Sequence, residues 1–151
     1  MSEADRKIIE QLVAGLLARR EHSLAELRAK LAARELDSAL CEQVLADFTQ
    51  RGWQSDERFA CLFARQRSQK GQGELRIRGE LQQRQVASAL IEQALAELDV
   101  DWFAAAKRAH DRKYLGRALD FKEKQRRARY LQYKGFSHEQ IRYALESLDD
   151  K

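Results

Sequence analysis

Apolar residues recur along this chain at the three-to-four-residue spacing of helices that bury one face. They predict a first helix of about four turns whose inward face carries Ile8, Ile9, Leu12, Val13, Leu16 and Leu17. Two further helices follow, because Ser23 can form a capping box with Glu26 and Asp37 can cap a longer apolar stretch. Gly52 is expected to end the third helix, since glycine readily adopts left-handed backbone angles. One unit therefore holds three helices.

The same unit returns after fifty residues. Residues 27–48 and 77–98 align without a gap and are identical at ten of 22 positions. A further shift of fifty keeps the residue type at many positions, and Arg34, Arg84 and Lys134 share one of them. This suggests a structural role, such as carrying charge toward a carboxylate of the third helix or covering apolar surface with the methylene stem. A period this long, kept three times, indicates a tandem array of helical units. The sequence thus predicts an all-α protein with three three-helix repeats, at residues 1–53, 54–99 and 100–151.

Capping residues also predict the helix starts of the later units. These are Ser55, either Asp99 or Asp101, Asp120 and Ser137. The seven glycines are expected to mark most of the helix ends. Composition points the same way, because the chain has no proline and is rich in residues that lose little side-chain freedom in a helix. A β-sandwich, which uses proline at turns and sheet edges, is disfavoured.

Several classes of protein are not expected. No apolar run approaches the roughly 18 residues of a membrane-spanning helix, and the first residues lack the apolar segment of a secretory signal. We therefore expect a soluble, cytoplasmic protein. Cys41 and Cys61 lie among apolar residues and are expected to be small buried side chains.

Catalytic and metal-binding patterns are also missing from the sequence. The three histidines are scattered and form no zinc-ligand set with the cysteines. The stretch 71–73 lacks the third glycine of a dinucleotide-binding loop. Asp120 and Glu123 fit a helix cap better than an acid–base pair. We expect no catalytic residue, no metal and no cofactor, and hence no enzyme.

Charge is distributed unevenly along the chain. The net charge is only +4, but residues 107–134 contain eleven basic and three acidic residues, a net charge of +8. On the helix expected after Asp120, Lys122, Arg126 and Arg129 form one stripe that Tyr133 continues. Like charges at this spacing weaken a helix by about 0.2–0.5 kcal/mol per pair. The stripe therefore indicates either a solvated face or a surface for a polyanionic partner, and both interpretations stay open.

A second basic stretch covers residues 65–84. Here Glu74 and Glu80 are spaced to pair with Arg78 and Arg84, which favours a structural role for this stretch.

Several segments resemble the RecX family of bacterial regulatory proteins. They are RGWQSDERFA (51–60), KGQG (70–73) and RIRGEL (76–81), extended by 101–102, 112–114 and 130–136. Together they cover nearly the whole chain in the family's order. Two glutamines depart from the family pattern, which usually has an aromatic residue at the position of Gln72 and commonly a leucine at that of Gln54. These two substitutions affect contacts of the local loops and do not alter the resemblance to the family.

The resemblance implies three three-helix units in an elongated, curved molecule that modulates the RecA recombinase. Such proteins bind the RecA–single-stranded DNA filament, suppress its ATPase and strand exchange, and limit filament growth in recombination and DNA repair. We therefore expect a monomer that contacts the filament and its single-stranded DNA through basic residues of units two and three: Lys70, Arg76, Arg78, Arg108, Arg112, Lys113, Lys122, Arg126 and Arg129. Two alternatives stay open, a helical nucleic-acid-binding protein that acts directly on DNA and a passive scaffold for another protein.

Overall fold

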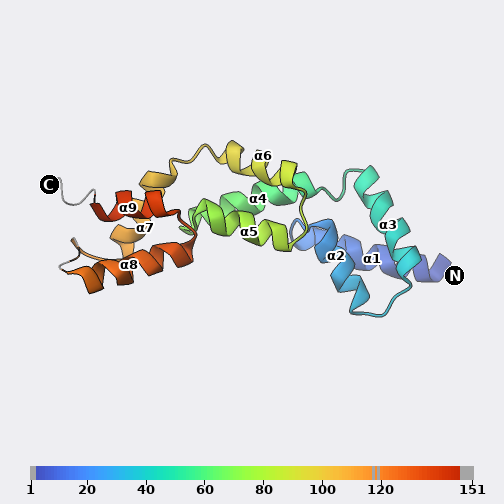
Figure 1. Ribbon diagram of the computed structural model, residues 1–151. Helices are drawn as coiled ribbons and strands as arrows, with labels where there is room; N and C mark the ends of the chain where they lie inside the picture. The colour runs from blue at the N-terminus through green and yellow to red at the C-terminus, as the bar shows by residue number, and fades with distance from the viewer. Residues whose placement is uncertain (1–2, 117, 119, 147–151) are drawn as a thin grey trace. The chain divides into compact units, whose positions relative to one another are not determined.

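The described part of the chain is entirely helical. The structure is a computed structural model that describes residues 3–116, 118 and 120–146, and in these residues nine α-helices form and no strand does (Figure 1). The helices are α1 (Glu3–Arg19), α2 (Leu24–Ala32), α3 (Ser38–Gln50), α4 (Asp56–Gln69), α5 (Glu74–Gln83), α6 (Ser88–Leu98), α7 (Trp102–Lys113), α8 (Phe121–Lys134) and α9 (His138–Glu146). The predicted all-α class is confirmed.

The expected caps account for most of the helix starts. Ser23 and Glu26 satisfy each other's backbone N–H groups, both at 3.1 Å. The carboxylates of Asp37 and Asp120 accept from the third residue beyond them, each at 2.8 Å. Of the two aspartates proposed for α7, Asp101 is the cap. The helix starts predicted from capping chemistry are thus confirmed at these positions.

Glycine has a narrower role than expected. Gly52, Gly71 and Gly135 follow helix ends with positive φ angles, as the sequence predicts. Gly15 and Gly79 instead lie inside α1 and α5. These two glycines end no helix, and Gly15 lies within the first helix that the sequence predicts.

Helices α1, α2 and α3 enclose the first core. Its most buried side chains include Val13 of α1, Leu27 of α2 and Val44 of α3, all fully excluded from solvent. Removing apolar side chains of this size from water contributes about 1.5–3 kcal/mol each, which drives the three helices together. Ile8 is an exception, because it is 49% exposed and lies off the inward face to which the sequence assigned it.

Helices α7, α8 and α9 enclose a second core in the same manner. Ala106 and Ala109 of α7, Leu131 of α8 and Ala144 of α9 are buried in it, and Trp102 packs against it as a partly buried anchor. The alanines on α7 leave room for α9, with which α7 makes its most extensive contact. This packing fixes the faces of α7 and α8 that remain in solvent.

Contacts within the chain define two compact units, a division distinct from that into three repeats; from here on, the first and second units are these two. The first holds the described residues up to Leu62 together with Leu81–Ala94, and the second holds Phe63–Glu80 together with the described residues from Leu95 onward. The division runs through α4, α5 and α6 rather than through loops. All nine basic residues proposed for binding belong to the second unit. In the described part of the chain, no helix combines the length and the apolar character that crossing a membrane requires.

Candidate functional site

The turn between α4 and α5 meets the C-terminal end of α8 through main-chain atoms. The N–H of Gly73 donates to the carbonyl of Lys134 at 2.7 Å, and that of Leu75 donates to the carbonyl of Gly135 at 3.0 Å. A Cβ on Gly73 would lie 2.5 Å from the carbonyl carbon and oxygen of Gly135, and a Cβ on Gly135 would overlap Arg76. Only glycine allows this approach, because backbone atoms cannot move aside as a flexible side chain can. The two glycines therefore bring the ends of three helices to one place.

Two cationic side chains flank the neighbouring glycine of this turn. The Lys134 Nζ and Arg112 Nη1 atoms lie 3.7 and 3.8 Å from the point that a Cβ on Gly71 would occupy. Lys134 is oriented by donating to the Lys70 carbonyl at 3.4 Å. Neither Arg112 nor Lys134 forms an ion pair with a carboxylate in the part of the chain that the structure describes. Two positive charges thus converge on the bare face of Gly71 without a counter-charge.

Other basic residues nearby are paired, which sets this site apart. Arg67 and Arg76 both pair with Glu80, at 3.8 and 3.2 Å. Arg78 pairs with Glu74 at 3.7 Å, as its spacing predicts. A surface that can supply carboxylates to these arginines supplies none to Arg112 and Lys134. The two cations repel each other where they converge on Gly71, so an anion bound between them would be stabilised.

Aromatic rings stand beside several of the predicted cations. The Arg76 guanidinium lies 4.8 Å from the ring centre of Tyr133 and donates to the Tyr133 carbonyl at 3.4 Å. Tyr133 is 70% exposed, so its ring is held in place yet accessible. The Lys113 Nζ lies 5.0 Å from the ring centre of Tyr130. These contacts fix long side chains that would otherwise lose rotamer entropy on binding a partner.

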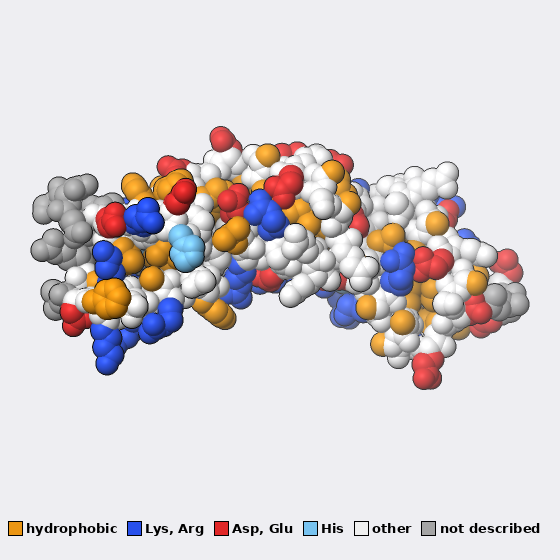
Figure 2. All heavy atoms as spheres, in the orientation of Figure 1, with side chains coloured by type: hydrophobic (Ala, Val, Ile, Leu, Met, Phe, Trp, Pro, Cys, Tyr) orange, Lys and Arg blue, Asp and Glu red, His pale blue; other side chains and the backbone are white. Residues whose placement is uncertain are grey.

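The predicted stripe on α8 is exposed. Lys122, Arg126 and Arg129 all face solvent, and Arg126 is the one with an acidic partner, Glu123 at 2.8 Å, among the residues described. Figure 2 shows Lys and Arg side chains gathered along the α8 edge of this face. Arg108 of α7 is exposed, and no described residue links it to the other eight. The structure therefore brings Arg112 to Gly71, next to Lys70 in the chain, and Arg76 to the end of α8, while Arg78 has a structural pair.

No other chemistry is evident at this surface. Among residues 3–116, 118 and 120–146, no group of three or more His, Cys, Asp or Glu side chains is placed to hold a metal ion. Cys41 is buried, and burial raises the pKa of its thiol, while Cys61 is half-buried.

Comparison with known proteins identifies the family of this chain. Models of the first, second and third three-helix domains of RecX match residues 11–48, 55–95 and 99–145. The chain belongs to the RecX family. A protein of Vibrio parahaemolyticus named "Regulatory protein RecX" is 44% identical over 136 residues, covering 89% of this chain and 88% of that protein. One of Halorhodospira halophila with the same name is 39% identical, covering 99% of this chain and 95% of the other.

Solved structures of RecX proteins share the fold. RecX from Lactobacillus salivarius superposes with a TM-score of 0.83 over 99% of this chain and all of the other, at 16% sequence identity. A second structure, of a regulatory protein RecX, gives a TM-score of 0.77 over 97% of this chain and 72% of that one, at 18% identity. The three-helix grouping predicted from the fifty-residue period is thus confirmed. We propose repeat boundaries at 53/54, which falls between the first two matched segments, and at 99/100, which falls one residue inside the start of the third.

The two glutamines that depart from the RecX pattern behave differently. Gln54 is buried, and its amide is fully used: it donates to the His22 carbonyl at 3.2 Å and to Asp56 at 2.9 Å, and accepts from Thr49 at 2.7 Å. Gln72 is buried beside the junction of α5 and α8, and its Oε1 has no hydrogen-bond partner among the described residues. The first departure is therefore compensated by a polar network, while the second leaves an unsatisfied acceptor.

Arg127 was not among the residues predicted for this site, and its i,i+4 spacing to Glu123 suits an exposed ion pair. The side chain is buried, although it does pair with Glu123 at 3.1 Å. Its Nη1 donates to the carbonyl of Gly116 at 2.6 Å and to His110 Nε2 at 3.0 Å, and its guanidinium lies 4.7 Å from the ring centre of Tyr114. Arg127 thus ties α8 to the end of α7 and to the segment that follows it. The sequence offers one signal, the i,i+4 spacing to Glu123, and that spacing suits exposed pairs equally well.

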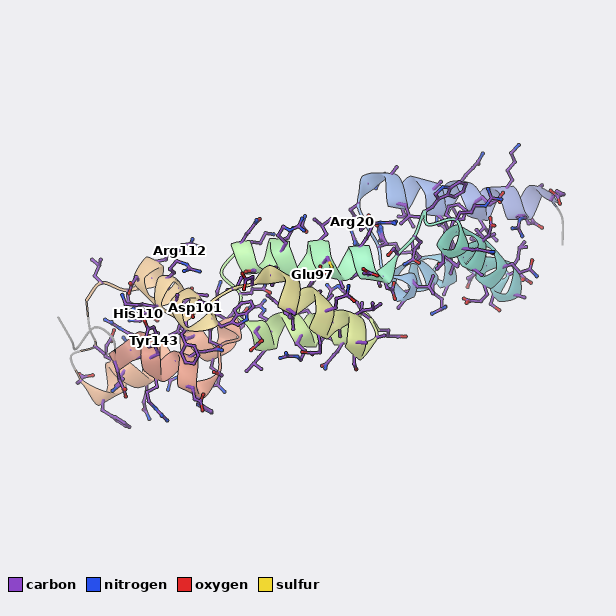
Figure 3. The ribbon with its side chains drawn as sticks, turned by 90° about the horizontal axis from the view of Figure 1, so that it is seen from above. Arg20, Glu97, Asp101, His110, Arg112 and Tyr143 are labelled. Carbon is purple, nitrogen blue, oxygen red and sulfur yellow. The ribbon has the colours of Figure 1, made fainter. Side chains whose placement is uncertain are left out.

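This network also orients the end of α7 that carries Arg112. Because an arginine cannot accept, His110 Nε2 must be the acceptor, so Nδ1 carries the proton and donates to Asp111 at 2.9 Å. Burial acts to raise the pKa of Asp111, but hydrogen bonds from His110 and Lys107 outweigh it, and that pKa is lowered. Figure 3 shows His110 and Arg112 projecting from the same helix. The buried side of α7 is therefore held by polar contacts while Arg112 is presented to solvent.

Lys134 is the second residue that the prediction missed. Its repeat position suggested a structural role, such as carrying charge toward a third-helix carboxylate or covering apolar surface. Arg84 lies 3.4 Å from Glu26 of α2, and Lys134 contacts a backbone carbonyl. At both copies the side chain therefore reaches the preceding repeat.

Proposed function

We propose that this protein binds a RecA–single-stranded DNA filament and inhibits its ATPase and strand exchange, thereby limiting filament growth in recombination and DNA repair. The curated relatives carry the name "Regulatory protein RecX", which supports a regulatory role. The observation that carries the proposal is the convergence of Arg112 and Lys134, without a counter-charge, on the bare face of Gly71. We further propose that the protein acts in the cytoplasm as a monomer and catalyses no reaction.

A phosphate of a nucleic-acid backbone suits this site. Charge-assisted N–H···O bonds are about 2.8 Å long, so two nitrogens within 3.8 Å of one point can both donate to one phosphate. The glycine leaves space that any other side chain would fill. The site thus favours an oxyanion between α7 and α8.

Single strands suit the remainder of the surface better than a duplex. Exposed Lys122 and Arg129 can follow a phosphate chain along α8. Tyr133, held by Arg76, offers an accessible ring on which an unstacked base can stack, an interaction worth about 1–3 kcal/mol per base. Duplex DNA hides the faces of its bases, so this ring would contribute nothing there.

The test is ATP hydrolysis by RecA on single-stranded DNA with the protein titrated in. We expect hydrolysis to fall to a low plateau, and the double substitution Arg112→Gln with Lys134→Gln to need about tenfold more protein for the same effect, the loss of about 1.4 kcal/mol. Arg142→Gln is the matched control, since Arg142 is exposed on α9 and has no acidic partner in the described chain. Undiminished hydrolysis at saturating protein would refute the proposal.

The alternative, a protein that acts directly on DNA, can be distinguished by how its DNA affinity changes with salt concentration. For naked duplex, log K falls by about 0.9 per neutralised phosphate for each log unit of salt, against about 0.7 for single strands. Tight binding to naked duplex, unchanged by RecA, would favour the direct DNA-binding alternative. Equal inhibition by wild type and the double variant would show that Arg112 and Lys134 do not contribute to binding the filament.

A further inference from the structure

A groove of about 640 Å³ lies between α1 and α2 in the first unit, and none of the residues proposed above lines it. Leu12 and Leu16 of α1 contribute apolar surface to it, and Gly15 lies between them. Arg19, Lys30 and Arg34 supply three positive charges at its edges, and no acidic residue lines it. The groove therefore combines an apolar floor with a basic rim.

The three cations have no counter-charge within the described chain. Arg19, Lys30 and Arg34 are exposed, and none has a side-chain partner among the residues described. Arginines elsewhere in this unit are paired, for example Arg28 with Glu42 at 2.7 Å and Arg58 with Glu21 at 2.9 Å. Because the first fifty residues carry nine acidic and seven basic side chains, a basic rim here is not a consequence of local composition.

Gly15 is difficult to explain by the folding of this chain alone. It lies in the interior of the 17-residue helix α1, where glycine is a weaker helix former than alanine. A Cβ at this position would meet nothing within 4 Å, so no contact in the described chain requires its absence. Bare backbone at the floor of a groove lets another main chain approach closely, which suits an incoming helix.

The later repeats show what the residue at the position of Arg34 contacts there. Arg84 and Lys134, the counterparts of Arg34, reach a carboxylate of Glu26 at 3.4 Å and the carbonyl of Lys70 at 3.4 Å in the preceding repeats. Arg34 has the same place in the first repeat, but within the described residues no acceptor reaches it. Both copies thus reach an oxygen acceptor of a neighbouring repeat, and the one at Arg84 is a carboxylate on a helix, which an incoming acidic helix could supply to Arg34.

We infer that the groove between α1 and α2 docks an acidic, amphipathic helical segment of a protein partner. Apolar side chains of such a helix would cover Leu12 and Leu16 over the bare backbone of Gly15, while its carboxylates meet Arg19, Lys30 and Arg34. A nucleic acid would satisfy the three cations but leave the apolar floor uncovered. The site shares no residue with the basic surface of the second unit, so it stands independently of the proposed function.

The probe is a labelled helical peptide with leucines at i, i+3, i+4 and i+7 and glutamates at the other positions, and its binding to the full-length protein is measured by fluorescence anisotropy. We expect Arg34→Glu to weaken binding by about tenfold or more. Gly15→Leu, which fills the groove, should do the same, and open space around Gly15 indicates that the variant folds. Lys7→Glu is the matched control on α1, since Lys7 is exposed and does not line the groove.

Several results would overturn the inference. They are equal binding of a peptide with glutamine in place of glutamate, unchanged affinity in both groove variants, and an equal loss in the Lys7→Glu control. Competition by a short oligothymidylate that Arg34→Glu abolishes would identify a nucleic-acid site instead. Concentration-dependent dimerisation that Gly15→Leu removes would identify a second copy of this chain as the occupant.

Discussion

The close approach of Gly73 and Gly135 makes a strong prediction about stability. Replacing Gly73 by alanine puts a methyl group 2.5 Å from the carbonyl carbon and oxygen of Gly135, so the turn and the end of α8 must separate. Two backbone hydrogen bonds, at 2.7 and 3.0 Å, cross this junction and would lengthen or break. The substitution therefore acts on the main chain and not only on packing.

The expected loss follows from these contacts. Forcing extra volume into a tightly packed site costs about 1–3 kcal/mol, and each buried backbone hydrogen bond contributes about 0.5–1.5 kcal/mol net. We expect Gly73→Ala to lower the free energy of unfolding by about 3 kcal/mol, a large share of the roughly 5–15 kcal/mol that stabilises most domains. Because Lys134 belongs to the displaced segment, the variant should also weaken the RecA inhibition proposed above.

Gly79 supplies the matched control, six residues further along the chain. It lies inside α5, and a Cβ there would meet nothing within 4 Å. Gly79→Ala should raise the free energy of unfolding by about 0.8–1 kcal/mol, because alanine is the better helix former. Both variants are measured by urea denaturation followed by circular dichroism. A loss below about 1 kcal/mol for Gly73→Ala, or a change of the same sign in the two variants, would refute the reasoning.

Three further predictions concern buried polar groups. Gln72→Met should raise the free energy of unfolding by about 1 kcal/mol by removing an unsatisfied acceptor, whereas Gln54→Met should lower it by about 2 kcal/mol, both measured by urea denaturation. Arg127→Met should cost about 3 kcal/mol in the same assay and leave Glu123 without this partner. Burial lowers the pKa of His22, so stability is fully present above about pH 6.5 and falls as the pH drops toward the lowered value. His22→Asn, which keeps a donor for the Arg20 carbonyl, should show a shallower pH dependence of unfolding, and an unchanged one would contradict this account.

Local chemistry made much of the fold predictable. Ser23 with Glu26, Asp37 and Asp120 cap helices where their side chains can reach free backbone N–H groups, and these contacts span only three residues. The fifty-residue period needed no knowledge of tertiary contacts, because each repeat carries its own apolar pattern. Helices and their grouping were therefore within reach of the sequence.

The candidate site was only partly predictable for the opposite reason. Arg127 and Arg126 are neighbours of the same type, yet the first is buried and the second exposed, and the difference depends on where α7 ends. Arg112 and Lys134 are 22 residues apart and converge only because two glycines bring a turn against α8. Charge counting identified the basic region, but contacts between distant segments decide which cations lack a counter-charge.

The two kinds of contact between successive repeats limit how the protein can be re-engineered. In the first unit the N–H of Leu24 is capped by the side chain of Asp56 at 2.8 Å, so that connection can be transplanted with a single residue. In the second unit the corresponding connection is made by main chain against main chain at Gly73 and Gly135. Shuffling or multiplying the repeats would therefore require grafting a whole turn with its backbone geometry. A chimera that matched only side chains would lack the main-chain hydrogen bonds that connect the two repeats.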